Sequence, residues 1–415
     1  MVYNIYAEMN IIYRLGLVVV FLAILISIIS YARGYRLDFA TKSVTPTGIL
    51  AVSSSPTAAK IYVNGQLKGV TNTNLTLPPG KYTVEIKRDG YTSWSKTVNL
   101  QGEVVVSLEA LLFPSNPSLS PLTNLDIVKA VPIDLTGKII IFSESGDATK
   151  DGIYLFDSSH NPLSFLPPTQ TLILKSSLPA AVKFTNDLQV DFSPDFKQAI
   201  FEFNIPTTKK KIKQTVGNYY AYLFSLDQEN QTPFDVTNSK DTLIEAWNKE
   251  RNAQNLKILE TFPKDIVKIA SDSFKVLSFS PDETKILYTP EVNLHLPKVL
   301  EIPQLGTDQT IETRNVIKNK VYVYDEKEDK NFDLSSFGFS VSNFPLWYPD
   351  SGHLLFNDSN KIVIFDYDGT NQQVVYSAQF EQNFFTVTPD GKIVVLTNLN
   401  PEINKFPDLY LVGIR

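Results

Sequence analysis

The phrase Val190-Asp-Phe-Ser-Pro-Asp195 recurs along the later part of the chain. It returns as Leu277-Ser-Phe-Ser-Pro-Asp282, as Leu346-Trp-Tyr-Pro-Asp350 and as Phe385-Thr-Val-Thr-Pro-Asp390. In three copies, apolar residues sit two and four places before the proline, which puts them on one face of a strand. Pro-Asp then favours a turn, because proline presets φ and aspartate bonds nearby backbone. The phrase therefore predicts a strand that ends in a tight hairpin.

The sequence after each copy predicts two further strands. An apolar run comes first, and a strand of one type follows, as in Ala221-Tyr-Leu-Phe224 and Ile362-Val-Ile-Phe-Asp366. A repeat of three or four antiparallel strands is typical of a β-propeller blade. Five repeats are visible, counting a weaker copy at Val131–Lys138, and six or seven blades stay open. Few residues follow Pro389, so we expect a segment near Leu125 to Val131 to pair into the last blade.

Composition limits the classes of function. The chain has 415 residues, of which 43% are hydrophobic and 12% aromatic, enough for two or three domains with a large core. Its formal net charge of −6 lacks the basic excess of a nucleic-acid binder. It contains no cysteine, which excludes disulfides, thiolate metal sites and a cysteine nucleophile.

The N-terminus carries a membrane signal. No charge interrupts Leu15–Ala32, and residues 11–32 are long enough to cross a bilayer. A cleaved signal peptide is the alternative, but Tyr31-Ala-Arg-Gly-Tyr35 is bulky and basic and offers no small-x-small cleavage pattern. We therefore expect residues 1–37 to be a tail and an uncleaved transmembrane anchor in contact with lipid. The expected lipid-facing side chains are Leu15, Val19, Leu22, Ile26 and Ile29.

Residues 48–110 predict a compact β-sandwich, after a linker at 38–47. Asn64-Gly65 is a strong two-residue turn between short alternating stretches, and Asp89-Gly90 marks another turn. Residues 111–124 are rich in proline and serine, which predicts an interdomain linker. The predicted propeller then occupies residues 125–415, so the chain as a whole is expected to be all-β with an inserted helix.

The small β unit resembles a PEGA domain. The features that carry the resemblance are Gly48-Ile-Leu-Ala-Val-Ser-Ser-Ser-Pro56, Ala59-Lys-Ile-Tyr-Val-Asn-Gly65, Leu77-Pro-Pro-Gly-Lys-Tyr82 and Asp89-Gly-Tyr91. At the motif that names the family, this chain keeps only a proline and the glycine. The later Ser-Pro-Asp phrases are similar to the WD40-like repeats of TolB-type propellers. Together these resemblances imply a bacterial, surface-layer-like protein whose β domains lie outside the membrane.

The charges beside the anchor point to the opposite orientation. Arg33, Arg36 and Lys42 follow the apolar segment, whereas Arg14 is accompanied by Glu8 before it. The positive-inside rule would place the C-terminal bulk in the cytoplasm. The family resemblance favours a single-pass cell-membrane protein with extracytoplasmic β domains, and a scaffold that faces the cytoplasm remains the alternative.

Insertions between the repeats are candidate contact surfaces. One insertion carries the candidate partner-binding residues Lys209, Lys210, Lys211 and Lys213, which could instead form a solvated loop tip. Residues 290–319 form a long polar insertion. Residues 241–262 predict a helix, with Thr242 and Glu245 as a capping box and Leu243, Trp247, Leu256 and Leu259 as its apolar residues.

The sequence offers no arrangement that predicts catalysis. The three histidines, His160, His295 and His353, occupy expected turns or loops, and no nucleophile elbow, P-loop, dinucleotide fingerprint or clustered zinc ligands accompany them. We therefore expect no catalytic residues, no cofactor site and no metal site. Asp366-Tyr-Asp-Gly-Thr-Asn371 has oxygen atoms spaced as in a calcium loop but lacks the distant glutamate, so a hairpin turn and a calcium site both stay open.

The features combine into one functional expectation. The chain is expected to be a membrane-anchored cell-envelope protein, with a PEGA-like stalk and a propeller head that binds or scaffolds an envelope partner. That partner could be a protein, a glycan or peptidoglycan, and nucleic acid is not expected. The alternative is a propeller-type hydrolase or lyase with an active site in its channel.

Overall fold

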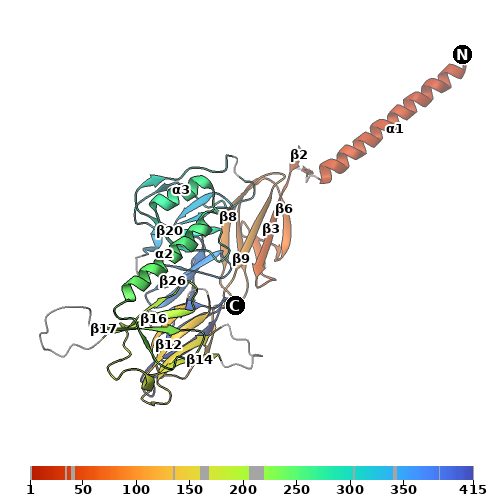
Figure 1. Cartoon of the computed structure of the whole chain (residues 1–415). Coiled ribbons are helices and arrows are strands. Elements are labelled where there is room, and N and C mark those ends of the chain that lie inside the picture. The colour runs from red at the N-terminus through yellow and green to blue at the C-terminus, as the bar shows by residue number, and fades with distance from the viewer. Residues whose placement is uncertain are drawn as a thin grey trace. The chain divides into compact units, whose positions relative to one another are not determined.

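The computed structural model describes residues 2–32, 35–38, 43–133, 136–158, 168–204, 219–301, 304–339, 344–382 and 384–414. Its first element is helix α1 (Val2–Ala32), drawn in red as one continuous rod in Figure 1. A short antiparallel hairpin of β1 (Tyr35–Asp38) and β2 (Ser43–Pro46) follows, in part of the region for which the sequence predicted a linker. The rest of the described chain divides into two compact units.

The first unit contains a β-sandwich of seven strands in two sheets. One sheet has the order β6-β3-β9, with β3 and β9 parallel, and the other has the order β5-β4-β7-β8. The strands are β3 (Gly48–Ser55), β4 (Lys60–Val63), β5 (Gln66–Val70), β6 (Thr73–Leu77), β7 (Gly80–Lys87), β8 (Trp94–Leu100) and β9 (Val105–Leu111). Alternate residues such as Leu50, Ile61, Val84 and Val106 fill the space between the sheets, as the period-two pattern requires.

The second unit contains five antiparallel four-stranded sheets, which form the blades of the propeller. Sheet 1 is β11-β12-β13-β14, sheet 2 is β15-β16-β17-β18, sheet 3 is β19-β20-β23-β24, sheet 4 is β25-β26-β27-β28, and sheet 5 is β10-β31-β30-β29. Five is therefore the number of blades among the described residues.

The bounds of these strands follow the repeats. They are β10 (Ser118–Pro121), β11 (Ile127–Ile133), β12 (Lys138–Ser143), β13 (Gly152–Asp157), β14 (Thr169–Leu174), β15 (Gln189–Phe192), β16 (Gln198–Asn204), β17 (Tyr219–Ser225), β18 (Phe234–Asp235), β19 (Phe274–Phe279), β20 (Lys285–Pro290), β23 (Tyr322–Asp325), β24 (Lys330–Asp333), β25 (Leu346–Trp347), β26 (His353–Asp358), β27 (Lys361–Asp366), β28 (Gln373–Tyr376), β29 (Phe385–Val387), β30 (Ile393–Thr397) and β31 (Asp408–Gly413). A minor pair, β21 (Leu294–His295) with β22 (Asn315–Val316), and two 3-10 turns, Lys175–Ser177 and Ser335–Phe337, complete the unit.

An N-terminal strand closes the last blade, as expected, but a different segment supplies it. Strand β10 pairs antiparallel with β31, so that Ser118 lies opposite Gly413. The prediction that residues 125–131 would do this was wrong, because most of them belong to β11, the first strand of sheet 1. The closing strand instead comes from the stretch that its proline and serine content had marked as a linker.

Neighbouring sheets pack face to face in the order 3-4-5-1-2. Sheets 1 and 2 share one apolar cluster, sheets 5 and 1 share a second, and sheets 3 and 4 share a third. Between sheets 4 and 5, the Tyr348 hydroxyl donates a hydrogen bond of 2.7 Å to the Gly391 carbonyl. The opposite faces of sheets 2 and 3 are covered by helices.

Two helices lie in the connection between sheets 2 and 3. Helix α2 (Lys240–Leu259) packs its first half, with Trp247, on sheet 2, and its end, with Leu259, joins α3 (Lys264–Ser273) on sheet 3. The predicted helix therefore exists, but α3 was not foreseen. The predicted capping box is wrong, because the helix begins after Ser239, which makes no side-chain cap bond. Of the apolar residues predicted for this helix, Trp247 and Leu259 are buried and Leu256 is 44% exposed.

The Pro-Asp turns of sheets 2, 3 and 5 share one hydrogen-bond pattern, and we call them hydroxyl corners. A buried hydroxyl two residues before the aspartate donates to its carboxylate, from Ser193 to Asp195 at 2.7 Å and from Ser280 to Asp282 at 2.7 Å. The same hydroxyl accepts a backbone N–H at the start of the next strand. Thr388 takes this role in sheet 5. The recurring phrase is thus explained by a local network that fixes the hairpin.

Candidate functional site

From Tyr13 to Tyr31, helix α1 has exposed side chains. Its apolar window, Tyr13–Tyr31, has none of its residues buried in the protein. The five predicted lipid-facing side chains are all exposed, at 67% for Leu15, 59% for Val19, 48% for Leu22, 62% for Ile26 and 48% for Ile29. Length, composition and exposure are compatible with a single-pass membrane anchor.

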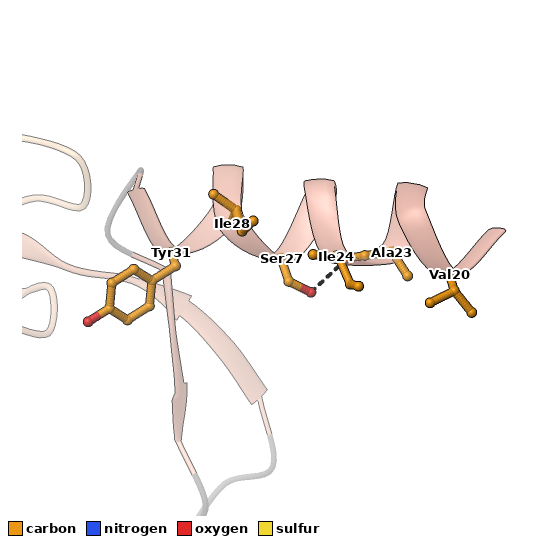
Figure 2. Close-up of a pocket in the computed structure, with 6 residues that line it drawn as sticks. All are labelled: Val20, Ala23, Ile24, Ser27, Ile28 and Tyr31. Carbon is orange, nitrogen blue, oxygen red and sulfur yellow. Dashed lines mark hydrogen bonds between the residues drawn. The ribbon is translucent and has the colours of Figure 1, made fainter. Parts of the chain in front are cut away.

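Figure 2 shows one stretch of this helix, from Val20 to Tyr31, with its side chains. The Ser27 hydroxyl donates a hydrogen bond to the Ala23 carbonyl at 2.8 Å, so its donor has a partner within the helix. This bond lowers the cost of placing a hydroxyl in hydrocarbon, where no water is available to replace it.

The order of the strands places the long insertions at one edge of the blades. In an antiparallel meander, successive connections alternate between the two edges of the sheet. The Pro-Asp corners join first and second strands, so the connections between second and third strands, and between sheets, leave from the opposite edge. Long connections of the propeller leave there, among them those from β16 to β17, from β18 through α2 and α3 to β19, and from β20 to β23. We call it the insertion edge.

The predicted lysine surface falls in one of these connections. Lys209, Lys210, Lys211 and Lys213 lie between β16 and β17, outside the described residues. The ends of β16 and β17 place the start and the finish of that connection at the insertion edge. Its role in binding stays a prediction.

A polar pocket lies at the insertion edge, where sheets 4 and 5 meet. Asn360, from the turn between β26 and β27, lines it with residues 377–382, and the cavity measures about 770 Å³. Two hydrogen bonds fix the lining loop. The Glu381 N–H donates to the Leu396 carbonyl at 2.7 Å, and the Thr397 hydroxyl donates to the Gln379 carbonyl at 2.7 Å. Sequence reasoning missed this pocket, because its residues lie in loops without a motif.

The insertion at residues 290–319 is tied down in two places. Its base is held by Arg314, which contacts Asp329 at 3.0 Å and donates to the Pro297 carbonyl at 3.0 Å. Its middle, Leu300–Thr310, packs with the β-sandwich as part of the first compact unit. A role of this insertion in contacting a partner stays a prediction.

The described histidines occupy different environments. His353 begins β26, and its ring nitrogens lie 2.8 Å from Asp350 and 3.2 Å from Asp366. Burial acts to lower the pKa of His353, but the bonds and charges of the two carboxylates outweigh it and raise the pKa to about 10. His295 is exposed and lies 2.7 Å from the Asn315 side chain. His160 lies outside the described residues.

The calcium-like segment forms a hydrogen-bonded turn between β27 and β28. Asp366 accepts a bond of 2.8 Å from the Asn371 amide and also contacts His353. Asp368 accepts bonds from the hydroxyl and the backbone N–H of Thr370, at 2.7 and 3.0 Å. Protein donors thus use the oxygens that a cation would need, which favours the hairpin turn over a calcium site.

Comparison with known proteins places the first unit in a family. The model of the PEGA domain family matches residues 47–116, which cover the whole β-sandwich. Residues 47–116 are thus similar to the PEGA domain. The resemblance seen in the sequence is confirmed, although the PEGA domain of this chain lacks the full motif that names the family. No curated protein matches the chain.

Solved structures similar to the chain include several propellers. A putative TolB from Agrobacterium tumefaciens shares 12% identity, with a TM-score of 0.20, and the match covers 74% of each chain. The β-propeller domain of the trilobed protease from Pyrococcus furiosus shares 11% identity, with a TM-score of 0.19 and coverage of 91% of this chain and 88% of that one. The sheet topology, and not these low scores, defines the fold beside the PEGA domain.

Proposed function

We propose that this chain is a membrane-anchored cell-envelope protein whose propeller binds or scaffolds an extracytoplasmic partner, without catalysis of its own. The observation that carries the proposal is the order of parts: an apolar helix with exposed side chains, then a PEGA domain, then five blades. Such an order suits a head held near a bilayer by a stalk. Blades provide a rigid base, and the loops at their edge provide contact residues.

The chemistry of His353 supports a binding role over hydrolysis. A general base needs a nitrogen that is free to take a proton. Both ring nitrogens of His353 face carboxylates that hold the protonated form, so this side chain suits a structural ion pair. No group of three or more metal-ligating side chains is found among the residues that the structure describes.

Two cysteine variants test the extracytoplasmic placement. The chain has no cysteine, so Ala253→Cys, at an exposed site of α2, and Ala7→Cys, before the apolar window, each create a single reactive thiol. An impermeant thiol reagent on intact cells should label Ala253→Cys at once and Ala7→Cys only after lysis. The reverse result would place the β domains in the cytoplasm, as the charges beside the anchor suggest.

Photo-crosslinking tests which edge of the blades meets the partner. A photoreactive amino acid at Gln379 sits at the insertion edge, and one at Lys197 sits at a hydroxyl corner on the opposite edge. Both side chains are exposed, so Lys197 is a matched control. Envelope adducts should form from Gln379 and not from Lys197. Equal adducts from both positions, or adducts from Lys197 alone, would refute the assignment of the insertion edge.

The lysine segment is tested in the same cells. Replacing Lys209, Lys210, Lys211 and Lys213 together by glutamine removes four positive charges from the connection between β16 and β17. If the partner is an anionic envelope polymer, adduct yield from Gln379 should fall several-fold and should fall in wild type as salt rises. An unchanged yield would remove the lysines from the binding surface while leaving the edge assignment intact.

A further inference from the structure

Strand β8 is an edge strand of the PEGA domain, and a distant segment occupies its edge. Asn99 of β8 donates its backbone N–H to the Gln309 side-chain carbonyl at 2.5 Å. The Gln309 amide nitrogen donates back to the Asn99 carbonyl at 3.1 Å. The side-chain amide therefore makes the two bonds that a residue of a neighbouring strand would make.

A nearly buried ion pair accompanies this contact. Lys96 of β8 lies 2.7 Å from Asp308, and the two side chains are only 14% and 8% exposed. Asp308 is itself positioned, because it accepts the Thr310 N–H at 2.8 Å. The edge thus receives a carboxylate for Lys96 and, one residue later, a peptide-like amide for Asn99.

The segment also approaches the backbone of the other sheet closely. Gly306 has a φ of +78°, and a Cβ added to it would meet the Val105 carbonyl oxygen of β9 at 2.3 Å. Glycine is required there both by the left-handed backbone and by the lack of space. The segment around Gly306 therefore packs closely against β9. At the β8 edge, it places a side chain in a position that a neighbouring strand could occupy.

We propose that the β8 edge is a strand-accepting peptide site, and that Asp308 and Gln309 are a resident ligand which an acidic extended peptide of a partner can replace. Among the described residues, Gln309 makes its ladder-like pair with Asn99. Side chains and outward backbone groups alternate along a strand, so those of Thr97 share the edge with those of Asn99. A true strand would therefore gain more backbone bonds than Gln309 makes, and its carboxylate would take Lys96.

The inference goes beyond the proposed function, since it assigns a second surface, on the PEGA domain and not on the propeller. The probe is a fluorescent peptide with the sequence of residues 304–312, added to the full chain in detergent micelles. The double variant Asp308→Asn, Gln309→Ala opens the edge, and Leu305→Ala, at a side chain 70% exposed, is the matched control.

The expected result has two parts. Amide hydrogen exchange at Asn99 should accelerate at least about tenfold in the double variant, whereas exchange in β3 and β7 stays slow and shows that the PEGA domain remains folded. The peptide should bind the double variant at least about tenfold more tightly than wild type or Leu305→Ala. A peptide with Asp308→Asn, or a chain that also carries Lys96→Met, should lose that gain.

Each failure has a separate meaning. Unchanged exchange at Asn99 would show that Gln309 does not hold the edge, which overturns the proposal at its first step. Faster exchange without peptide binding would show that the Gln309–Asn99 contact serves only to hold the chain's own segment, and it would overturn the peptide site. Neither result bears on adduct formation at the insertion edge, so the two proposals fail independently.

Discussion

The corners of sheets 2, 3 and 5 and the corner of sheet 4 make the same turn with different chemistry. In the hydroxyl corners, Ser193, Ser280 and Thr388 are at most 4% exposed and link the aspartate to the next strand. In sheet 4, Tyr348 takes the place of the hydroxyl residue, and Asp350 pairs with His353 instead. The comparison shows that a hydroxyl–carboxylate network and a histidine–carboxylate ion pair can each fix one backbone turn, and that only the second requires a protonated histidine.

The largest effect is expected from His353→Gln. Removing the imidazolium leaves Asp350 and the buried Asp366 without the cation that lies between them, and breaking a buried pair in this way costs about 3–5 kcal/mol. Urea unfolding of the full chain in detergent measures it. His295→Gln, at an exposed histidine, is the control and should change stability by less than about 0.5 kcal/mol. Equal losses of stability in the two variants would show that the His353 ion pair does not stabilise the corner of sheet 4.

The pH dependence of the same pair sharpens the comparison. The folded pKa of His353, about 10, lies above its ordinary value of 6.5, so its stabilisation is complete below pH 6.5 and is lost as pH rises towards 10. The stability difference between wild type and His353→Gln should therefore shrink over that window. A difference that stays constant from pH 6 to 10 would contradict the ion pair.

A smaller loss is expected at a hydroxyl corner. Ser193→Ala removes the donor to Asp195 and the acceptor of the Gln198 N–H, which lies 2.9 Å away. A buried donor left without a partner costs about 1–2 kcal/mol. Ser193→Thr keeps the hydroxyl and should recover most of the loss. If alanine and threonine behave alike, the hydroxyl does not explain the recurring serine.

The smallest effect is expected from Asp282→Asn. Burial acts to raise the pKa of Asp282, but bonds from Ser280 and Thr284 and the charges of Lys285 and Lys327 outweigh it and lower the pKa. The carboxylate is 37% exposed, so solvent screening limits the cost to about 1 kcal/mol at neutral pH. Its stabilisation is present above pH 4 and is lost in acid, so wild type and variant should converge below that pH.

The fold was predictable where the signal is local. The hydroxyl corner joins residues within five positions of each other, so it leaves a phrase that repeats in the sequence. The family resemblance likewise rests on turns such as Asn64-Gly65, which lie inside the matched region. The transmembrane segment needs only a continuous apolar run. Each of these features can be recognised without knowing what packs against it.

The missed features depend on partners far away in the sequence. Strand β10 is the outer strand of its sheet and mostly exposed, so no apolar alternation marks it, and only pairing with β31 makes it a strand. Lys96 and Asp308 are 212 residues apart. The role of Asp366 depends on the cross-strand register that sets it opposite His353. No local pattern encodes such contacts.

Phe113 has a mechanical consequence. It is 2% exposed, and its ring lies 6.3 Å from that of Tyr348 and 6.4 Å from that of His353. In the chain it follows β9, the last strand of the sandwich, and precedes β10. Tension that reaches the propeller through the backbone from the membrane therefore meets this docked ring before it can load the closing strand. The packing of Phe113 therefore holds the chain against sheet 4 before the closing strand begins.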